Sequence, residues 1–407
     1  NIRDAINKKI NFFDEKSGKE YKLNEKTAVL IVRPRGLHLD EKNVTIDGKR
    51  ISGTFFDLGL SLFHNAKKLI ENGSGPYFYL PKLEHYLECR LLNKVISFCE
   101  KKLDLKVGTV KVTVLIETIN AVFQMDEFLW ELKDHIVGLN AGRWDYLFSY
   151  QKVYRNTKKV ILPDRSKVNM FVPFMSNYNK LLVDTCHKRG AFGMGGMSAQ
   201  VIAKANPKEI NEKALAGVKK DKERELNQGN DGAWVAHPSL VGEVKKIFEK
   251  NFKGPNQLNK FNSEKIGRRD LLDEPKIDNE ITEQGVRENL NEGIEYLAFW
   301  VIGTGCCVVN YLMADAATCE VSRAQLWIWL KYKVKLNDGR TVDEKLIDEL
   351  IKDELNKIKN KFIAWKKKTG DQSLDNVSFE TAARIFREMI TKDNFDDFLT
   401  LPLYEKI

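Results

Sequence analysis

The chain has 407 residues and a formal net charge of +9, with 43% hydrophobic and 30% charged residues. This composition excludes a disordered or low-complexity chain, and the length suffices for a large α/β core in one or two domains. The six cysteines lack the CxxC spacing of metal sites, so a reduced, cytosolic setting fits better than a disulfide-rich secreted one.

The basic residues are dispersed along the chain and interleaved with acidic ones, as in the segment 352–361. That pattern is typical of solvated helix faces, and no nucleic-acid-binding motif accompanies it. The positive charge therefore predicts a small anionic substrate and no nucleic-acid partner.

No N-terminal signal peptide is visible, and residues 405–407 are not a peroxisomal SKL-type tripeptide. The uncharged stretch 296–314 is nearly long enough to span a bilayer, but Gly303, Gly305 and Asn310 interrupt it. We predict a buried helix and a tight loop there, in a cytoplasmic protein without a membrane segment.

Eight short apolar runs can be placed before residue 240, and helical patterns separate several of them. Parallel strands with helices outside are typical of a TIM barrel, so the predicted fold class is α/β with a (β/α)8 barrel. The first and second runs lack a clear helix between them. The runs are 27–33, 53–60, 76–80, 109–117, 136–140, 169–174, 190–195 and 233–236, with helical patterns at 62–72, 83–102 and 177–188.

The second half of the chain has a different pattern. Charge-rich residues 205–231 predict an exposed helix before the last strand, and polar residues 251–280 predict a linker. Beyond the linker only helical patterns appear, at 283–300, 322–332, 342–361 and 379–390, with Ser322 as a candidate N-cap. We therefore predict a barrel domain over residues 1–280 and an all-helical C-terminal domain over 281–407.

Two carboxylates, Glu117 and Asp145, end two of the apolar runs, and the amphipathic segment 126–134 lies between those runs. Strand, helix and strand form a βαβ unit, which places both acids at the carboxyl-end rim of the sheet. Two such oxygen ligands, completed by waters and a substrate oxygen, suit Mg2+. The alternative is that each acid only caps a helix or meets solvent.

The sequence around these acids resembles malate synthase of the A type. The resemblance runs in family order from about residue 30 to residue 407, although the chain starts at Asn1 without that family's usual N-terminal helical region. The matching words are Ile31-Val-Arg-Pro-Arg-Gly36, Val114-Leu-Ile-Glu-Thr118, His135-Ile-Val-Gly-Leu-Asn140, Gly142-Arg-Trp-Asp-Tyr146, Thr185-Cys-His-Lys-Arg-Gly190, Met194-Gly-Gly-Met197, Asp231-Gly-Ala-Trp-Val-Ala-His-Pro238, Asp315-Ala-Ala-Thr318 and Phe398-Leu-Thr-Leu-Pro402.

The resemblance implies a TIM barrel and an acyltransferase of the glyoxylate cycle. Such an enzyme condenses acetyl-CoA with glyoxylate and hydrolyses malyl-CoA to malate and CoA. Glu117 and Asp145 match the family's Mg2+ ligands, and Asp315 matches its catalytic base. Arg33 matches the arginine that stabilises the enolate oxygen, with Arg35 as the competing candidate. Without the resemblance, Asp315 reads as an ordinary helix cap.

The resemblance also implies substrate-binding positions. Gly142 and Trp144 belong to a strand-end loop whose backbone N–H groups would face the glyoxylate carboxylate, while Trp234 and Pro238 would flank the aldehyde pocket and the pantetheine channel. Departures from the family pattern are Leu37, Phe192, Gly193 and Ala314, and they bear on acyl-CoA binding and on the base. The alternatives are a related malyl-CoA or citryl-CoA lyase and an inactive acyl-CoA-binding relative.

Overall fold

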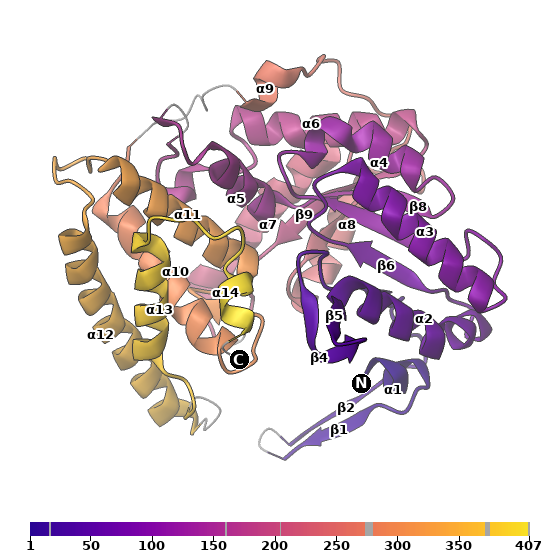
Figure 1. Ribbon diagram of the computed structural model, residues 1–407, viewed down its shortest axis with the longest axis horizontal. Helices are drawn as coiled ribbons and strands as arrows, with labels where there is room; N and C mark the ends of the chain where they lie inside the picture. Colours follow the sequence, from indigo (N-terminus) through magenta and orange to yellow (C-terminus); the bar gives the residue numbers. More distant parts are fainter. Residues whose placement is uncertain (16–17, 159–160, 204, 273–279, 371–374, 406–407) are drawn as a thin grey trace. The chain divides into compact units, whose positions relative to one another are not determined.

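The computed structural model describes residues 1–15, 18–158, 161–203, 205–272, 280–370 and 375–405. The chain divides into two compact units, and Figure 1 labels the elements of both. The first unit comprises residues 1–116, 120–140 and 188–192. The second comprises residues 117–119, 141–187 and 193–407.

Short apolar strands form the centre of the first unit, because apolar side chains on both faces allow a strand to be buried on both faces. Strand β6 (Tyr77–Leu80) pairs in parallel with β3 (Ile31–Val32) on one side and with β7 (Lys111–Ile116) on the other. Strand β8 (Ile136–Ala141) follows β7 in the sheet. Every residue of β7 after Lys111 is buried, so this strand lies at the core of the unit.

Three helices accompany these strands: α2 (Gly53–Glu71), α3 (Tyr86–Lys102) and α4 (Met125–Glu131). They pack in sequence, α2 on α3 and α3 on α4. A capping box starts α3, in which the side chains of His85 and Glu88 satisfy backbone N–H groups. The smaller elements of the unit are α1 (Ile2–Ile6), β1 (Asn11–Asp14), β2 (Lys19–Lys22), β4 (Asp40–Ile46), β5 (Lys49–Ser52) and the 3-10 turn η1 (Ala121–Gln124).

Two of the eight predicted strands are wrong. Residues 53–60 are the start of α2, whose buried Leu58, Leu62 and Leu69 lie on one helical face. Residues 169–174 form a turn and the start of α6 (Pro173–Lys188). In that turn the Asn169 side chain accepts a hydrogen bond from the Phe171 N–H at 2.9 Å, a contact that competes with strand pairing. The other six runs contain strands in the described residues.

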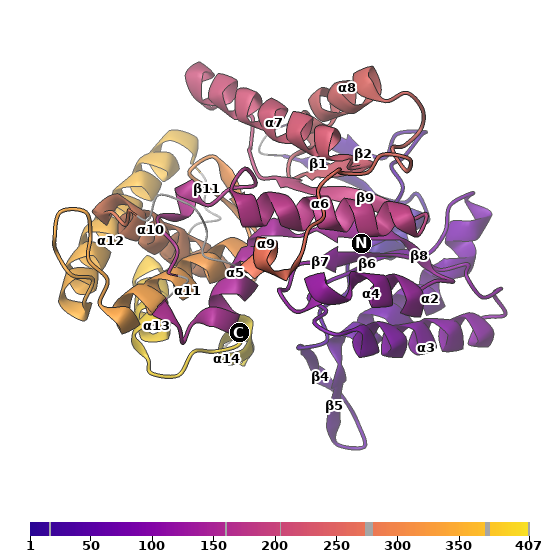
Figure 2. The ribbon, with the colours of Figure 1, turned by 90° about the horizontal axis from the view of Figure 1, so that it is seen from above.

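The second unit contains the strands that follow. Strand β9 (Phe192–Ser198) pairs in parallel with β10 (Gly232–Val235), and helices α7 (Lys208–Gln228) and α8 (Val241–Asn251) pack against each other beside them (Figure 2). The predicted exposed helix is α7, but one of its faces is buried and charged. Helix α5 (Arg143–Tyr154), η3 (Arg165–Lys167), η4 (Pro238–Leu240) and α9 (Arg268–Leu272) complete this part.

The predicted linker contains α9, and residues 273–279 lie outside the described residues. After it, four helices pack around a common apolar core, as Figure 1 shows. They are α10 (Glu283–Trp300), α11 (Ala316–Tyr332), α12 (Glu344–Thr369) and α13 (Phe379–Thr391), followed by the short α14 (Thr400–Tyr404).

This helical part differs from the prediction in two details. An antiparallel hairpin, β11 (Cys307–Val309) with β12 (Leu312–Ala314), interrupts the helices. Helix α11 begins six residues before the predicted Ser322, which lies in its buried interior, because Asp315 supplies the N-cap. The hairpin strands are too short for a sequence pattern to distinguish them from a loop.

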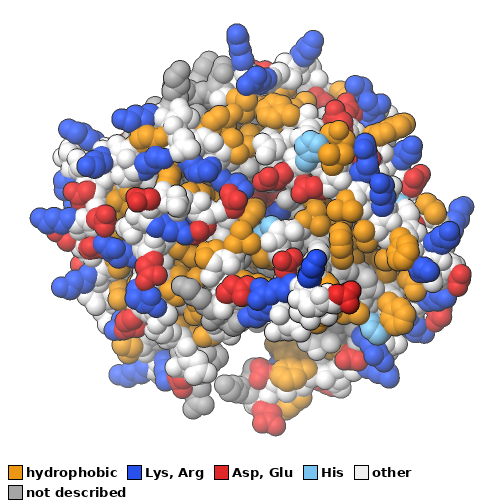
Figure 3. Space-filling view, viewed as in Figure 1, with side chains coloured by type: hydrophobic (Ala, Val, Ile, Leu, Met, Phe, Trp, Pro, Cys, Tyr) orange, Lys and Arg blue, Asp and Glu red, His pale blue; other side chains and the backbone are white. Residues whose placement is uncertain are grey.

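Helix α10 ends at Trp300, inside the uncharged stretch 296–314. None of the helices in the described ranges is both long enough and apolar enough to cross a membrane. On the face drawn in Figure 3, Lys and Arg side chains are interspersed with Asp and Glu, in agreement with the pattern in the sequence.

Candidate active site

Glu117 directly follows β7 and is 2% exposed. The chain then turns towards α5, where the Ile119 N–H donates a hydrogen bond to the Ser149 hydroxyl at 2.9 Å. The segment that carries Glu117 is therefore attached to the same helix that carries Asp145.

Asp145 lies in the first turn of α5, after Arg143 and Trp144, and not at the end of a strand as predicted. Strand β8 already ends at Ala141, and Gly142 is the N-cap of the helix. The first N–H groups of a helix have no partner within it and form its positive end. The predicted backbone donors at 142–144 thus belong to a helix N-terminus, which is a suitable site for a carboxylate.

A buried tyrosine, Tyr178 of α6, connects these groups. Burial, together with the negative charges that Tyr146, Glu117 and Asp145 place near it, raises the pKa of its phenol far above the usual value. A hydrogen bond with the Gly142 backbone opposes this shift. Tyr178 also stacks on Tyr146, with ring centroids 4.0 Å apart and planes 5° from parallel. The charges of both carboxylates are therefore felt at this phenol, which sequence reasoning missed because Tyr178 fits a plain amphipathic helix.

The donor set suits a hard divalent cation. Glu117 and Asp145 are both buried, and carboxylate oxygens are the ligands that Mg2+ prefers. Within the described ranges, no group of three or more His, Cys, Asp or Glu side chains gathers to hold a metal. Two carboxylates without histidine or thiolate fit an open magnesium site, with remaining positions for water and substrate, and do not fit a structural zinc site.

Asp315 is half-buried and begins α11, where its side chain accepts hydrogen bonds from the Ala317 and Thr318 N–H groups at 3.0 and 3.3 Å. Asp315 thus caps a helix, as the alternative interpretation of the sequence predicted. Its position is nevertheless tied to the barrel strands, because β12 leads into Asp315 and bonds to the segment after β9. There the Met313 N–H donates to the Ala199 carbonyl at 2.7 Å, and the Val201 N–H donates to the Tyr311 carbonyl at 3.0 Å.

Helix α11, which Asp315 starts, packs directly on α5, which carries Asp145. Arg165 adds polar contacts beside this packing, since its guanidinium donates to the Ser322 hydroxyl at 2.8 Å and lies 5.9 Å from the Trp144 ring. The elements that carry Glu117, Asp145 and Asp315 are therefore in direct contact within the second unit.

The two candidate arginines lie in the first unit. Arg33 is exposed and follows β3. The Arg35 guanidinium is held by two carboxylates, Glu41 at 2.8 Å and Asp57 at 2.9 Å. Arg35 therefore helps to hold the segments of Glu41 and Asp57 together.

The remaining two predicted residues lie in β10 and shortly after it. Trp234 lies within that strand, next to Met197 of β9, and is only partly buried. Pro238 is exposed at the start of η4. Both residues therefore lie at or just after the carboxyl end of the last strand, where the sequence predicted them.

A buried ion cluster supports the first turn of α5. The Arg143 guanidinium donates to the Asp221 carboxylate at 3.0 and 3.1 Å and also to the Met197 carbonyl at the end of β9. On the same face of α7, Lys222 donates to the Gly196 carbonyl at 2.6 Å and to Glu225 at 2.9 Å. This cluster joins α5, β9 and α7. The charge-rich sequence of α7 predicts an exposed helix, whereas Lys222 and Glu225 of this helix are buried.

Comparisons with known proteins identify the family of the sequence. The family model of the malate synthase TIM-barrel domain matches residues 29–274, and that of the malate synthase C-terminal domain matches residues 280–407. Malate synthase of Myxococcus xanthus is 45% identical over 408 residues, covering 100% of this chain and 73% of that protein. Malate synthase A of Escherichia coli is 43% identical over 406 residues, covering 99% and 74%.

Among solved structures, a pyruvate/acetyl-CoA ternary complex of Haloferax volcanii malate synthase matches with a TM-score of 0.47 and 13% identity, over 68% of this chain and 69% of that one. The family models confirm the predicted fold class, a TIM barrel followed by a helical C-terminal domain. With both domains matched and relatives above 40% identity along its whole length, the chain belongs to the malate synthase family.

Proposed function

We propose that this chain condenses acetyl-CoA with glyoxylate in a Mg2+-dependent reaction and hydrolyses the resulting malyl-CoA to malate and CoA. Membership of the malate synthase family supports the reaction. The observation that carries it is that buried Glu117 follows β7 on a segment bonded to α5, the helix whose first turn holds the buried Asp145. This grouping offers a cation site and anion-binding N–H groups in one place.

In this proposal Glu117 and Asp145 hold the Mg2+ ion. The bound ion supplies Lewis-acid polarisation and a template for the glyoxylate oxygens. The N–H groups of the first turn of α5 bind the glyoxylate carboxylate, because the N-terminus of that helix favours negative charge. Binding at this turn orients the aldehyde carbon for attack.

Asp315 is the proposed base that takes a proton from the acetyl methyl group. The hairpin and α11 hold it half-buried, and partial loss of solvent makes a carboxylate a stronger base. Its Oδ1 atom accepts two backbone hydrogen bonds, which hold the carboxylate in place at the start of α11. Arg33 is the proposed partner of the enolate oxygen, as a permanently charged guanidinium.

Trp234 and Pro238 are proposed to flank the aldehyde pocket and the pantetheine channel. The division into a barrel over residues 1–280 and a C-terminal domain over 281–407 is likewise a proposal, as is a cytoplasmic location.

The test is release of free CoA, followed with a thiol reagent, from acetyl-CoA and glyoxylate in the presence of Mg2+. We expect glyoxylate-dependent release with malate as the second product. Reversible cleavage of malyl-CoA without free CoA would instead identify an acyl-CoA lyase. Acetyl-CoA binding by folded protein without any turnover would identify an inactive relative.

A further inference from the structure

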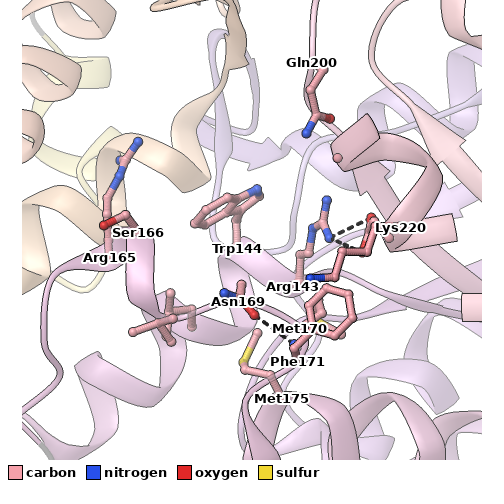
Figure 4. A pocket seen from close by; sticks show the side chains of 14 residues that line it. Arg143, Trp144, Arg165, Ser166, Asn169, Met170, Phe171, Met175, Gln200 and Lys220 are labelled. Carbon is pink, nitrogen blue, oxygen red and sulfur yellow. Dashed lines mark hydrogen bonds and ion pairs between the residues drawn. The ribbon is translucent and has the colours of Figure 1, made fainter. Parts of the chain in front are cut away.

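A cavity of about 340 Å³ lies within the second unit, beside the first turn of α5. Its walls come from α5, the segment 165–171, the start of α6, Gln200 and α7, and Figure 4 shows these side chains. The volume is at the lower end of the range for small-molecule sites. The cavity is therefore large enough for a small organic molecule.

Three buried polar atoms of the cavity residues have no hydrogen-bond partner in the described part of the chain: Nε of Arg143, Nε1 of Trp144 and Oε1 of Gln200. In Figure 4 the indole nitrogen and the Gln200 amide both face the space next to Arg143. A buried polar group without a hydrogen-bond partner destabilises the folded state, so we expect a ligand or a water molecule to bind these atoms. Two of the three are N–H donors, which calls for an acceptor such as a carboxylate.

The charge of the cavity favours the same ligand. The guanidinium of Arg143 is paired with Asp221, and that of Arg165 lies 3.5 Å from Glu292. Lys220 has no carboxylate partner among the described residues, and its ammonium group lies 4.8 Å from the centre of the Phe171 ring. One uncompensated positive charge therefore borders the cavity.

The rest of the lining is largely apolar. The side chains of Leu147, Val168, Met170, Phe171 and Met175 form this part of the wall. Apolar walls stabilise a hydrocarbon or aromatic body, while the Gln200 oxygen can accept a hydrogen bond from a hydroxyl group. The chemistry of the walls thus matches a small carboxylate with an apolar body.

The cavity is distinct from the proposed metal and base site. Neither Glu117, Asp145 nor Asp315 lines it. Trp144 belongs to both places, because its backbone N–H lies at the helix N-terminus while its indole ring forms a wall of the cavity. The ring therefore borders the cavity from the same helical turn that carries Asp145.

We infer that this cavity is a second anion site, which binds a small carboxylate with an apolar or aromatic body and thereby controls the first turn of α5. Arg143, Trp144 and Lys220 bind the carboxylate, and Gln200 accepts from a hydroxyl group on the ligand. Binding itself is independent of the proposed reaction, whereas its effect on turnover rests on the proposed function.

The test uses 4-hydroxyphenylacetate as a probe, with the full chain and without substrates, by isothermal titration calorimetry. We expect wild-type protein to bind the probe and Lys220→Met to bind it about tenfold more weakly, because one charge-assisted contact is lost. Lys219→Met is the matched control, since Lys219 is the preceding residue of α7, is exposed and pairs with Glu223 at 3.9 Å. It should bind as wild type does.

Steady-state kinetics in the presence of the probe show whether it binds in the cavity or in the substrate site. We expect the probe to raise the KM for glyoxylate to a limiting value, because it acts through the turn proposed to bind the glyoxylate carboxylate, and Lys220→Met to require about tenfold more probe for the same effect. Failure to bind, or equal weakening in both lysine variants, would overturn the site. A KM that rises without limit as the probe concentration increases would also overturn it, by placing the probe in the substrate site. Because calorimetry needs no turnover, loss of the proposed activity would leave the binding result intact.

Discussion

At the scale of single residues, Asp315 has two tasks that can be separated. Its side chain caps α11 through the N–H groups of Ala317 and Thr318, and it is also the proposed base. Asparagine caps a helix about as well as aspartate, but an amide cannot accept the acetyl proton. The cap was one of the two expectations from sequence, and its presence does not exclude the other.

We predict that Asp315→Asn lowers kcat by about 100-fold or more and leaves the melting temperature nearly unchanged. CoA release and thermal unfolding measure the two effects. Asp343→Asn is the matched control, because Asp343 caps α12 in the same way, through the Leu346 N–H at 2.8 Å. Equal kcat in wild type and Asp315→Asn would remove Asp315 from the chemistry.

The two arginines of the first unit give a second prediction. Arg33 is exposed, so Arg33→Gln should leave stability unchanged and lower kcat by about 100-fold if its charge stabilises the enolate. Arg35→Gln removes the partner of Glu41 and Asp57 and should lower the free energy of unfolding by about 1–3 kcal/mol. Kinetics and denaturant unfolding of both variants check this, and the reverse pattern would make Arg35 the catalytic arginine.

At the scale of elements, the first turn of α5 is the centre of the site, and buried ionic contacts fix its position. Burial alone would raise the pKa of Asp221, but the neighbouring guanidinium and ammonium groups hold that pKa well below its usual range. Asp221 is thus a charged anchor for Arg143, the first residue of α5. The anchor positions the N–H groups and the carboxylate that follow it.

We predict that Asp221→Asn raises the KM for glyoxylate about tenfold, with a smaller change in kcat, because the anion-binding turn is loosened while the base is retained. Steady-state kinetics with varied glyoxylate measure this split. Glu223→Gln, two residues along α7 and exposed, is the control and should behave as wild type. An unchanged KM in a folded Asp221→Asn protein would show that the anchor does not position the turn.

The same elements show how far sequence reasoning reaches. The burial of β7 and β8 follows from their apolar runs, and Glu117 was correctly placed after β7. Asp145 was misplaced by one helical turn, since the run of small and apolar residues continues past the strand into Gly142. Tyr178 and Asp221 could not be recognised, because local patterns do not reveal which long-range charges meet inside a fold.

At the scale of the whole molecule, a buried histidine ties distant segments of the second unit together. His187 of α6 bonds to Asp231 before β10 at 2.9 Å and to the Lys260 carbonyl at 2.6 Å. Burial lowers its pKa, but the bonds to Asp231 and to the Lys260 backbone outweigh burial, so the pKa lies above its ordinary value of 6.5. With a proton on each ring nitrogen, the imidazolium donates to both partners at once.

This arrangement predicts a pH dependence of stability. Because the folded-state pKa of His187 is raised above 6.5, its contribution is complete below that pH and is lost as the pH rises through the folded-state pKa. We expect the melting temperature to fall between about pH 6 and pH 8, with a flatter profile in His187→Gln. Thermal unfolding of both proteins across this pH range tests the prediction. The same dependence of melting temperature on pH in wild type and His187→Gln would contradict the role given to His187.

The central claim is that Glu117 and Asp145 form the metal site of a malate synthase reaction. The most direct measurement is the Mg2+ dependence of glyoxylate-dependent CoA release, for wild type and Glu117→Gln after removal of bound metal with EDTA. We predict no release without metal, saturable recovery in wild type, and recovery in the variant only at much higher Mg2+. Release that persists without metal, or the same Mg2+ curve for both proteins, would contradict the account.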